Sequence, residues 1–343
     1  MDGKRERLAD LLDRAGILRA LLWARKYSRK LWLPVLTYHR IAEPTAGSKF
    51  DRDVIDATPD QFDRQIAMLA RHFQIVGTAE VADHVSGRAR LPPNALAITF
   101  DDGYLDCHDT ALPILRRHGV KAVFFIATSY TSERRLYWWE SIHYALSQTN
   151  EQTIAIEYPE RVAVPNNSRA PKTLTRLVKT TRGLDVDRFL SGLFSVCNVE
   201  WSRCTEVQLA DQLVMTWDHI RALRDAGMDV QSHTRTHRVL GTVPPDELDD
   251  ELGGSREELA AELGTEIRAV AYPVGHSITA VPGVAEAIRR AGYEMGFTNG
   301  TGMTPMYRWH DPFDLRRYAM DVTFSDEYLR GMLAVPALAR VRR

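Results

Sequence analysis

The chain is poor in cysteine and has no long apolar run. Its 343 residues include three cysteines, Cys107, Cys197 and Cys204, without CxxC spacing. A scattered, odd set argues against a disulfide framework and against a cysteine-based zinc site. No apolar segment approaches the ~20 residues of a membrane-spanning helix, and no segment at the start has the pattern of a signal peptide. We therefore expect a cytoplasmic protein.

The chain also lacks an excess of either positive or negative charge. The chain carries 44 Lys and Arg against 45 Asp and Glu, a net charge of -1, so bulk electrostatics favour neither nucleic acid nor an anionic surface as a partner. Internal repeats are absent. The hydrophobic fraction of 44% and charged fraction of 26% are typical of a globular protein. This length suits one large α/β domain with an insertion, or two domains.

Residues 1–30 form a basic amphipathic segment. Leucine and isoleucine recur near helical spacing between positions 4 and 27, and lysine and arginine cluster from Arg19 to Lys30. A helix packed on the protein's own surface explains this pattern, and weak peripheral contact with the inner membrane leaflet is the alternative. Because Glu6, Asp10 and Asp13 dilute the positive charge, we favour the packed helix.

From residue 31 to residue 335, short β-like runs alternate with helical patterns. Such alternation predicts parallel strands joined by helical crossovers. Seven or eight such units indicate a distorted (β/α) barrel, whose functional site lies on the loops after the strands. The expected strands are 33–38, 73–76, 95–100, 122–126, 228–231, 269–272, 295–297 and 315–319, and the expected helices are 59–71, 78–86, 110–118, 217–225, 245–263 and 284–291.

The alternation stops between residues 129 and 214. This stretch is too long for one crossover, and it contains helical patterns at 174–181 and 186–194. We predict a helical insertion that interrupts the barrel, with Trp138 and Trp139 packed in its core. Whether it caps the site or only elaborates the structure stays open.

Two adjacent carboxylates follow the apolar run 95–100. Successive residues of a strand point to opposite faces, so Asp101 and Asp102 face one site only if the chain turns at once. Gly103 permits that turn because it has no Cβ. We therefore expect both carboxylates to reach the cavity at the strand end.

Two histidines follow the run 228–231. His233 and His237 are four residues apart, which places both imidazoles on one side of a helical turn or tight loop. An isolated pair of this kind is weak evidence, but it lies on the same predicted barrel face as the two aspartates. One Asp and two His are an open ligand set for a catalytic divalent metal, and the second Asp is left as a base. The sequence predicts a metal-dependent hydrolase.

These residues also carry a family resemblance. Thr99-Phe100-Asp101-Asp102-Gly103-Tyr104 and Ser232-His233-Thr234-Arg235-Thr236-His237 resemble the first two motifs of the polysaccharide deacetylase family (NodB homology, carbohydrate esterase family 4). The resemblance covers roughly residues 33–320 and leaves the insertion unmatched. Weaker similarity runs through 37–41, 217–221, 271–275 and 292–298.

The resemblance implies a distorted (β/α) barrel and removal of N-acetyl groups from N-acetylhexosamine units. It assigns Asp102, His233 and His237 to one divalent metal and Asp101 to the catalytic base. Zinc is the expected metal, and manganese, cobalt or nickel also fits such ligands. The backbone N–H of Val274 is expected to stabilise the oxyanion. The residues predicted to bind the substrate or its oxyanion are Tyr104, Tyr272, Pro273 and Val274.

Two parts of the family pattern have no clear match. The arginine that normally precedes the proline of the third motif, and orients the base, is replaced by Tyr272. His310 is the predicted general acid, with Asp311 or Asp314 raising its pKa, and His39 is a weaker candidate. A substitute for the missing arginine is expected among Arg268, Arg308 and Arg316.

Three functions follow from these patterns. The first is a deacetylase acting on a polysaccharide or on a glycan precursor, such as a lipid-linked intermediate met before export. The second is a metal-dependent amidase acting on a non-glycan C–N substrate. The third is a non-catalytic carbohydrate-binding relative, which the presence of Asp101 beside the complete ligand set disfavours because a binding protein needs no base there.

Overall fold

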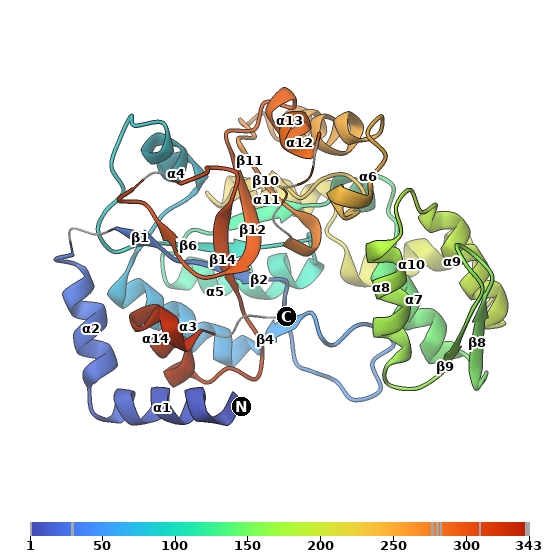
Figure 1. Ribbon diagram of the computed structural model, residues 1–343, viewed down its shortest axis with the longest axis horizontal. Helices are drawn as coiled ribbons and strands as arrows, with labels where there is room; N and C mark the ends of the chain where they lie inside the picture. Colours follow the sequence, from blue (N-terminus) through green and yellow to red (C-terminus); the bar gives the residue numbers. More distant parts are fainter. Residues whose placement is uncertain are drawn as a thin grey trace.

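Seven parallel strands form a closed ring at the centre of the protein (Figure 1). The computed structural model describes residues 2–28, 31–275, 278, 281, 283–308 and 310–339. Around the ring the strands follow the order β2, β14, β12, β11, β10, β7 and β6, and β6 pairs again with β2. They are β2 (Val35–Tyr38), β6 (Ala95–Phe100), β7 (Val123–Ile126), β10 (Asp229–Ser232), β11 (Ala269–Ala271), β12 (Met295–Thr301) and β14 (Leu315–Ala319). The predicted (β/α) barrel is confirmed.

Four further pairings extend the ring or lie outside it. β5 (Gln74–Ile75) adds to the start of β6 in parallel. β1 (Trp32–Leu33) pairs with β13 (Thr304–Pro305), and β3 (Arg40–Ile41) pairs with β4 (Ile55–Ala57) directly after β2. The fourth pair, β8 (Thr153–Ile156) with β9 (Val162–Pro165), lies in the insertion.

Both faces of the barrel strands are buried, and they belong to two separate cores. Inward side chains such as Val35, Phe125 and Leu315 fill the ring. Outward side chains such as Leu36 and Phe124 pack against the helices. Strands covered on both faces read as continuous apolar runs, which is why the sequence located them well.

Helices surround the ring and begin where the sequence supplies caps. Thr58 caps α3 and Thr216 caps α11, each with a reciprocal bond from the third helical residue. The surrounding helices are α3 (Pro59–His72), α4 (Thr78–Val85), α5 (Leu112–Arg117), α11 (Trp217–Asp225), α12 (Ser255–Leu263), α13 (Val284–Arg290) and α14 (Asp326–Ala334).

The insertion lies beside the barrel, with a β-hairpin on its outer side (Figure 1). Its helices are α6 (Thr128–Ser132), α7 (Trp138–Gln148), α8 (Ala170–Thr180), α9 (Val186–Val196) and α10 (Arg203–Leu213). The expectation of an all-helical insertion misses this hairpin. Ile154 and Ile156 are buried while their neighbours are exposed, a period-two pattern that specifies a strand. Trp138 and Trp139 are buried, as expected.

The N-terminal segment forms two helices instead of one. α1 (Asp2–Arg14) and α2 (Ile17–Arg25) are separated by Gly16, whose φ of 73° breaks the helix. Ala9, Leu18 and Leu22 are buried, and Asp13 forms an ion pair with Arg330 of α14 at 2.7 Å. Both helices therefore pack on the protein's own surface. Within the described ranges, no helix combines the length and apolarity needed to cross a bilayer.

Candidate active site and metal centre

The chain turns immediately after β6 and presents two buried carboxylates. The Asp101 N–H donates to the carbonyl of Tyr38 at 2.9 Å, which extends the β2–β6 pairing by one residue. Asp102 itself then adopts a φ of 75° and Gly103 a φ of 100°. The turn therefore begins one residue earlier than expected. It brings the carboxylates of Asp101 and Asp102 within 3.8 and 3.3 Å of the same nitrogen, Nε2 of His233.

The histidine motif forms a tight loop after β10. The His233 N–H donates to the carbonyl of Ile126 at 2.9 Å, so the end of β7 fixes the start of the loop. Thr234 and His237 have φ values of 66° and 54°, which exclude a helix. The buried carboxylate of Glu251 accepts hydrogen bonds from backbone N–H groups of the loop, including that of Thr236 at 3.0 Å. A loop, and not a helical turn, brings the two imidazoles together.

Asp102, His233 and His237 form a compact set of ligand atoms. One atom from each lies within 4.8 Å of the others. The His233 Nδ1 lies 2.8 Å from the carbonyl of Ala271, so this nitrogen carries the proton and Nε2 presents its lone pair. His237 Nε2 lies 3.2 Å from Asp102 Oδ1.

The electrostatics of this set fit a divalent cation. Oδ1 of Asp102 is buried and accepts no hydrogen bond within the described chain. Burial opposes ionisation of Asp102, but His237 and His233 hold the pKa of its carboxyl well below the usual range. Burial lowers the pKa of His237, which favours the neutral ligand form. A buried carboxylate facing two imidazoles is an open three-ligand site for a metal such as zinc.

Backbone strain is concentrated at the same place. Six non-glycine residues in the described ranges have positive φ, and four of them, Asp102, Thr234, His237 and Val274, belong to the site motifs. For a β-branched residue such as Val274, whose φ is 63°, this conformation is rare. Strained residues persist where the surrounding structure fixes them, and they cluster at functional sites.

Arg317 supplies the arginine that the third motif lacks. Its guanidinium makes two hydrogen bonds of 2.8 Å to the two oxygens of Asp101, and both side chains are buried. Burial opposes ionisation of Asp101, but Arg317 holds the pKa of that carboxyl below its usual range. None of the predicted arginines has this position. Arg268 precedes β11 and pairs with Glu294, and Arg308 and Arg316 are exposed.

The alternation of side chains along β14 contains the signal for Arg317. Leu315 and Arg317 are buried, whereas Arg316 between them is exposed. Leu315 belongs to the core inside the ring, so Arg317 also points inward. An arginine whose side chain points into the barrel needs a buried carboxylate as its partner, and Asp101 is that carboxylate.

His39 lies beside the carboxylate pair because it directly follows β2, the neighbour of β6. Its Nδ1 lies 2.9 Å from Oδ2 of Asp56, which the short β3–β4 pair places next to it. Burial by itself lowers the pKa of His39, but Asp56, with a contribution from Asp102, raises it to about 9. At neutral pH His39 therefore carries a proton that its Nε2 can donate.

His310 lies at the other end of the barrel. It comes before β14, whereas Asp101 and His233 come directly after their strands, and all seven strands are parallel. Its Nδ1 faces the carbonyl of Arg308 at 3.1 Å. The structure therefore separates the predicted general acid from the metal ligands. The direction of β14, which follows His310 in the chain, places this residue toward the amino ends of the strands.

The two tyrosines predicted to bind substrate are packed behind the site. The rings of Tyr104 and Tyr272 are at most 1% exposed, so neither offers a face to a sugar. The Tyr272 hydroxyl donates to the carbonyl of Phe313 at 3.0 Å, and its ring lies against Gly296, where a Cβ would come within 1.7 Å of the hydroxyl oxygen. Pro273 is buried. Val274 comes three residues after Ala271, the last residue of β11, whose carbonyl accepts the hydrogen bond from Nδ1 of His233.

The first turn of α7 supports the metal ligands from the insertion. The Trp138 Nε1 donates to the carbonyl of His237 at 3.4 Å, and the Trp139 ring lies 4.4 Å from the His237 ring. The Trp139 Nε1 donates to the hydroxyl of Tyr104 at 2.7 Å, and that hydroxyl lies 2.8 Å from Oε1 of Glu140. The sequence pattern predicted only core packing for Trp138 and Trp139 and did not connect them with the ligands. The insertion is thus part of the site's framework.

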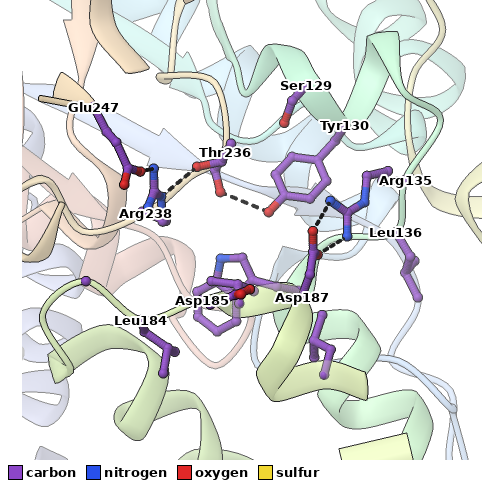
Figure 2. Close-up of a pocket in the computed structure, with 14 residues that line it drawn as sticks. Ser129, Tyr130, Arg135, Leu136, Leu184, Asp185, Asp187, Thr236, Arg238 and Glu247 are labelled. Atoms are coloured by element: carbon purple, nitrogen blue, oxygen red, sulfur yellow. Dashed lines mark hydrogen bonds and ion pairs between the residues drawn. The ribbon is translucent and has the colours of Figure 1, made fainter. Parts of the chain in front are cut away.

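A cavity of about 380 Å³ lies between the insertion and the loop that carries His237 (Figure 2). Two arginines that line it form ion pairs with carboxylates that also line it (Figure 2). Arg135 pairs with Asp187, and Arg238 pairs with Glu247. Trp138 lines this cavity and also bonds to the carbonyl of His237, so the cavity adjoins the ligand loop. It is an open groove, lined by both polar and apolar side chains, next to the loop that carries His237.

Several solved structures have a similar fold. A Streptococcus pyogenes deacetylase, PplD in complex with acetate, has a TM-score of 0.58 and 19% identity, with 88% of this chain and 97% of that chain covered. A de-N-acetylase from Aggregatibacter actinomycetemcomitans has a TM-score of 0.54 and 15% identity, with 88% of this chain and 99% of that chain covered. IcaB from Ammonifex degensii has a TM-score of 0.52 and 18% identity, with 90% of this chain and 97% of that chain covered. No curated protein sequence matches the chain.

A sequence profile gives the family directly. The profile described as polysaccharide deacetylase matches residues 88–187 and 189–296, more than half of the 343 residues. The matched segments contain Asp101, Asp102, His233 and His237, which the structure brings to one end of the barrel. With this match and the shared barrel, the chain belongs to the polysaccharide deacetylase family.

Proposed function

We propose that this protein is a metal-dependent deacetylase that removes N-acetyl groups from N-acetylhexosamine units of a polysaccharide or glycan precursor. One observation carries the proposal. Three buried ligand groups converge within 4.8 Å, while a fourth group, Asp101, lies beside them and is held by Arg317 instead of joining the set. A ligand set with a separate base is the arrangement that amide hydrolysis requires.

Asp102, His233 and His237 would hold the cation. A divalent metal there supplies polarisation of the amide carbonyl and lowers the pKa of water. Asp101 accepts a proton from the attacking water, because Arg317 keeps its carboxylate ionised and fixes its orientation. The water oxygen adds to the acetyl carbon to give a tetrahedral oxyanion, and the C–N bond then breaks as the carbonyl group re-forms.

His39 donates the proton to the leaving amine. Asp56 holds its Nδ1, so Nε2 is the nitrogen that faces a reacting group. The products are acetate and a free amino sugar, and the net proton transfer from Asp101 to His39 restores the enzyme. The N–H of Val274, on its strained turn after β11, is the candidate donor to the oxyanion.

Two further observations support removal of an acetyl group from a glycan. PplD, the first structural neighbour described above, was solved with acetate, the small product of N-acetyl hydrolysis. The open groove beside the ligand loop has room for sugar units, and its walls combine charged groups such as Arg135 and Asp187 with apolar ones such as Trp138 and Leu184. A mixed wall suits a sugar chain, which presents both hydroxyl groups and C–H faces.

The first experiment measures zinc binding by calorimetry on the metal-stripped protein. We expect one tight site in the wild type, lost in His233→Ala and Asp102→Ala and kept in His310→Ala, a matched histidine control from the other end of the barrel. Acetate release from N-acetylated chito-oligosaccharides follows on the loaded enzyme. Hydrolysis of cyclic amides in place of the oligosaccharides would support the amidase instead. Tight metal binding with no turnover of either class would support the non-catalytic relative.

A further inference from the structure

The exposed apolar side chains of this protein are gathered on its two N-terminal helices. Seven large hydrophobic residues are exposed in the described ranges, and six of them lie between positions 8 and 27. Leu11, Trp23 and Tyr27 are 64, 59 and 70% exposed. We call this set the N-terminal surface; its members are Leu8, Leu11, Ile17, Leu21, Trp23 and Tyr27.

The helices that carry this surface are fixed to the barrel. Ala9 is buried against α14 so closely that a Cβ on Gly331 would lie 3.0 Å from its side chain. Asp13 and Arg330 form two hydrogen bonds of 2.8 and 2.7 Å. Figure 1 shows α1 and α2 lying beside α14. Exposure of the N-terminal surface is therefore a property of the folded protein, because Ala9, Leu18 and Leu22 of the same helices are already buried.

The same segment concentrates positive charge. Residues 1–30 contain nine Lys and Arg and four Asp and Glu, a net charge of +5, although the whole chain carries -1. In the part of the chain that the structure describes, Arg7, Arg19 and Lys26 are exposed and make no ion pair. The positive charge extends to α3, since burial and then Lys26 and Arg71 lower the pKa of His72.

The structure weakens the main argument against a membrane partner, because it pairs two of the three acids on which that argument depends. Asp10 and Asp13 dilute the positive charge in the sequence, but Asp10 pairs with Arg14 at 2.8 Å and Asp13 is buried against Arg330. These acids therefore do not face an approaching partner as unpaired charges. What faces outward is a mixture of leucine, aromatic and basic side chains, which is the composition of helices that lie in a membrane interface.

A groove continues the surface past the end of α2. It contains Tyr307, the seventh exposed hydrophobic residue, together with Lys26 and Arg90. Trp23 and Tyr27 pack against each other with ring centroids 5.0 Å apart. Aromatic rings with a polar edge beside basic side chains suit the level of lipid headgroups.

We propose that the N-terminal surface docks the protein on a bilayer that contains anionic phospholipid. The leucines and aromatic rings enter the acyl boundary, and Arg7, Arg19 and Lys26 contact the phosphates. A second copy of the chain fits poorly, because it would bring two surfaces of net positive charge together. Nucleic acid offers the phosphates but no hydrocarbon for the leucines. The inference does not depend on the deacetylase function.

Co-sedimentation with vesicles tests this proposal. We expect the wild type to bind vesicles of phosphatidylcholine mixed with phosphatidylglycerol, and to bind phosphatidylcholine alone at least about tenfold more weakly. The triple variant Leu11→Asn/Leu21→Asn/Trp23→Gln should lose at least about tenfold in partitioning, because it removes the inserted area. Arg7→Ala/Arg19→Ala should lose binding to the mixed vesicles, whereas the matched control Arg116→Ala/Arg161→Ala, also exposed, should not.

Two measurements keep the test decisive. Thermal unfolding of the triple variant should match the wild type, since the three replaced side chains are exposed. Light scattering reports the oligomeric state. A wild type that binds neither vesicle, or a triple variant that binds as well as the wild type, would overturn the proposal. A dimer that dissociates in the triple variant would assign the surface to a second copy and would also overturn it.

Discussion

The two ends of the barrel each hold an arginine–carboxylate pair with two hydrogen bonds. At the carboxyl end Arg317 contacts Asp101 at 2.8 and 2.8 Å. At the amino end Arg268 contacts Glu294 at 2.7 and 2.9 Å. The side chains of the first pair are 0 and 1% exposed, and those of the second are 15 and 37% exposed. The two pairs have similar hydrogen-bond lengths but contribute differently to stability, because water screens the exposed Arg268–Glu294 pair and does not reach the buried Arg317–Asp101 pair.

The two ends also differ in what surrounds each pair. At the carboxyl end His233 lies within 3.8 Å of Asp101, and the backbone is strained at Asp102. At the amino end Arg268 and Glu294 join two strands at the surface. A charged pair by itself does not mark a site in this protein. Convergence of several titratable groups on strained backbone does.

The largest expected effect comes from breaking each pair in turn. Arg317→Met leaves Asp101 buried without its partner, so we expect a loss of ~3–5 kcal/mol in the free energy of unfolding. Arg268→Met breaks a partly exposed pair and should cost ~0.2–1 kcal/mol. Urea denaturation of both variants measures the difference. Equal losses would show that burial does not distinguish the two ends.

The second contrast concerns the two candidate acids. His39→Gln should lower kcat for deacetylation by ~10²–10⁴, the range for loss of a general acid, while zinc binding is retained. His310→Gln, at the amino end, should leave kcat unchanged. Steady-state kinetics with calorimetry on the same preparations separates the two. Loss of activity in His310→Gln alone would return the acid role to the residue that the sequence favoured.

The third contrast concerns the pH dependence of stability at Glu140. Burial raises the pKa of Glu140 to about 8 in the folded protein. The folded state therefore keeps a proton that the unfolded state has lost above its ordinary pKa of 4.5. The contribution of Glu140 to stability is full below about pH 4.5 and falls by up to ~1.4 kcal/mol per pH unit as the pH rises toward 8. Glu140→Gln resembles the protonated form and should remove this decline in urea unfolding measured from pH 5 to 8.

Glu294 supplies the opposite and smaller case. Arg268 lowers the pKa of Glu294, so its contribution is present above the unfolded pKa and is lost as the pH falls through the folded value. We expect Glu294→Gln to reduce stability at neutral pH by less than about 1 kcal/mol, and to have no effect in acid. The same denaturation series measures it. A decline with rising pH attributed to Glu294 would contradict the comparison of the two ends.

Most of the barrel could be predicted from the sequence. The expected strands 95–100 and 315–319 coincide with β6 and β14, and the expected helix 217–225 coincides with α11. These elements are specified locally, by continuous apolar runs and by caps such as Thr216. The hairpin at 153–165 was missed because its short alternating strands lie within a segment dominated by helical patterns.

The site residues also divide into those that local sequence identified and those that it did not. Asp101, Asp102, His233 and His237 stand in short motifs directly after strands, and parallel strands carry such motifs to one end of the barrel. Tyr104 also directly follows such a strand, but the fold buries it under the insertion, with its hydroxyl held by Glu140 and Trp139. Adjacency in sequence located these residues. It did not determine which of them face the cavity.

What the sequence by itself determined was therefore the barrel, the two motifs and the family, because each depends on residues close together in the chain. Only the tertiary structure decided the partners of the catalytic groups. Arg317 lies 216 positions from Asp101, and residue type alone did not distinguish it from the other arginines. The direction of β14 removed His310 from the site, and the pairing of β2 with β6 brought His39 into it. Burial and nearby charges then determined the protonation states of the titratable groups, and these neighbours are far away in the sequence.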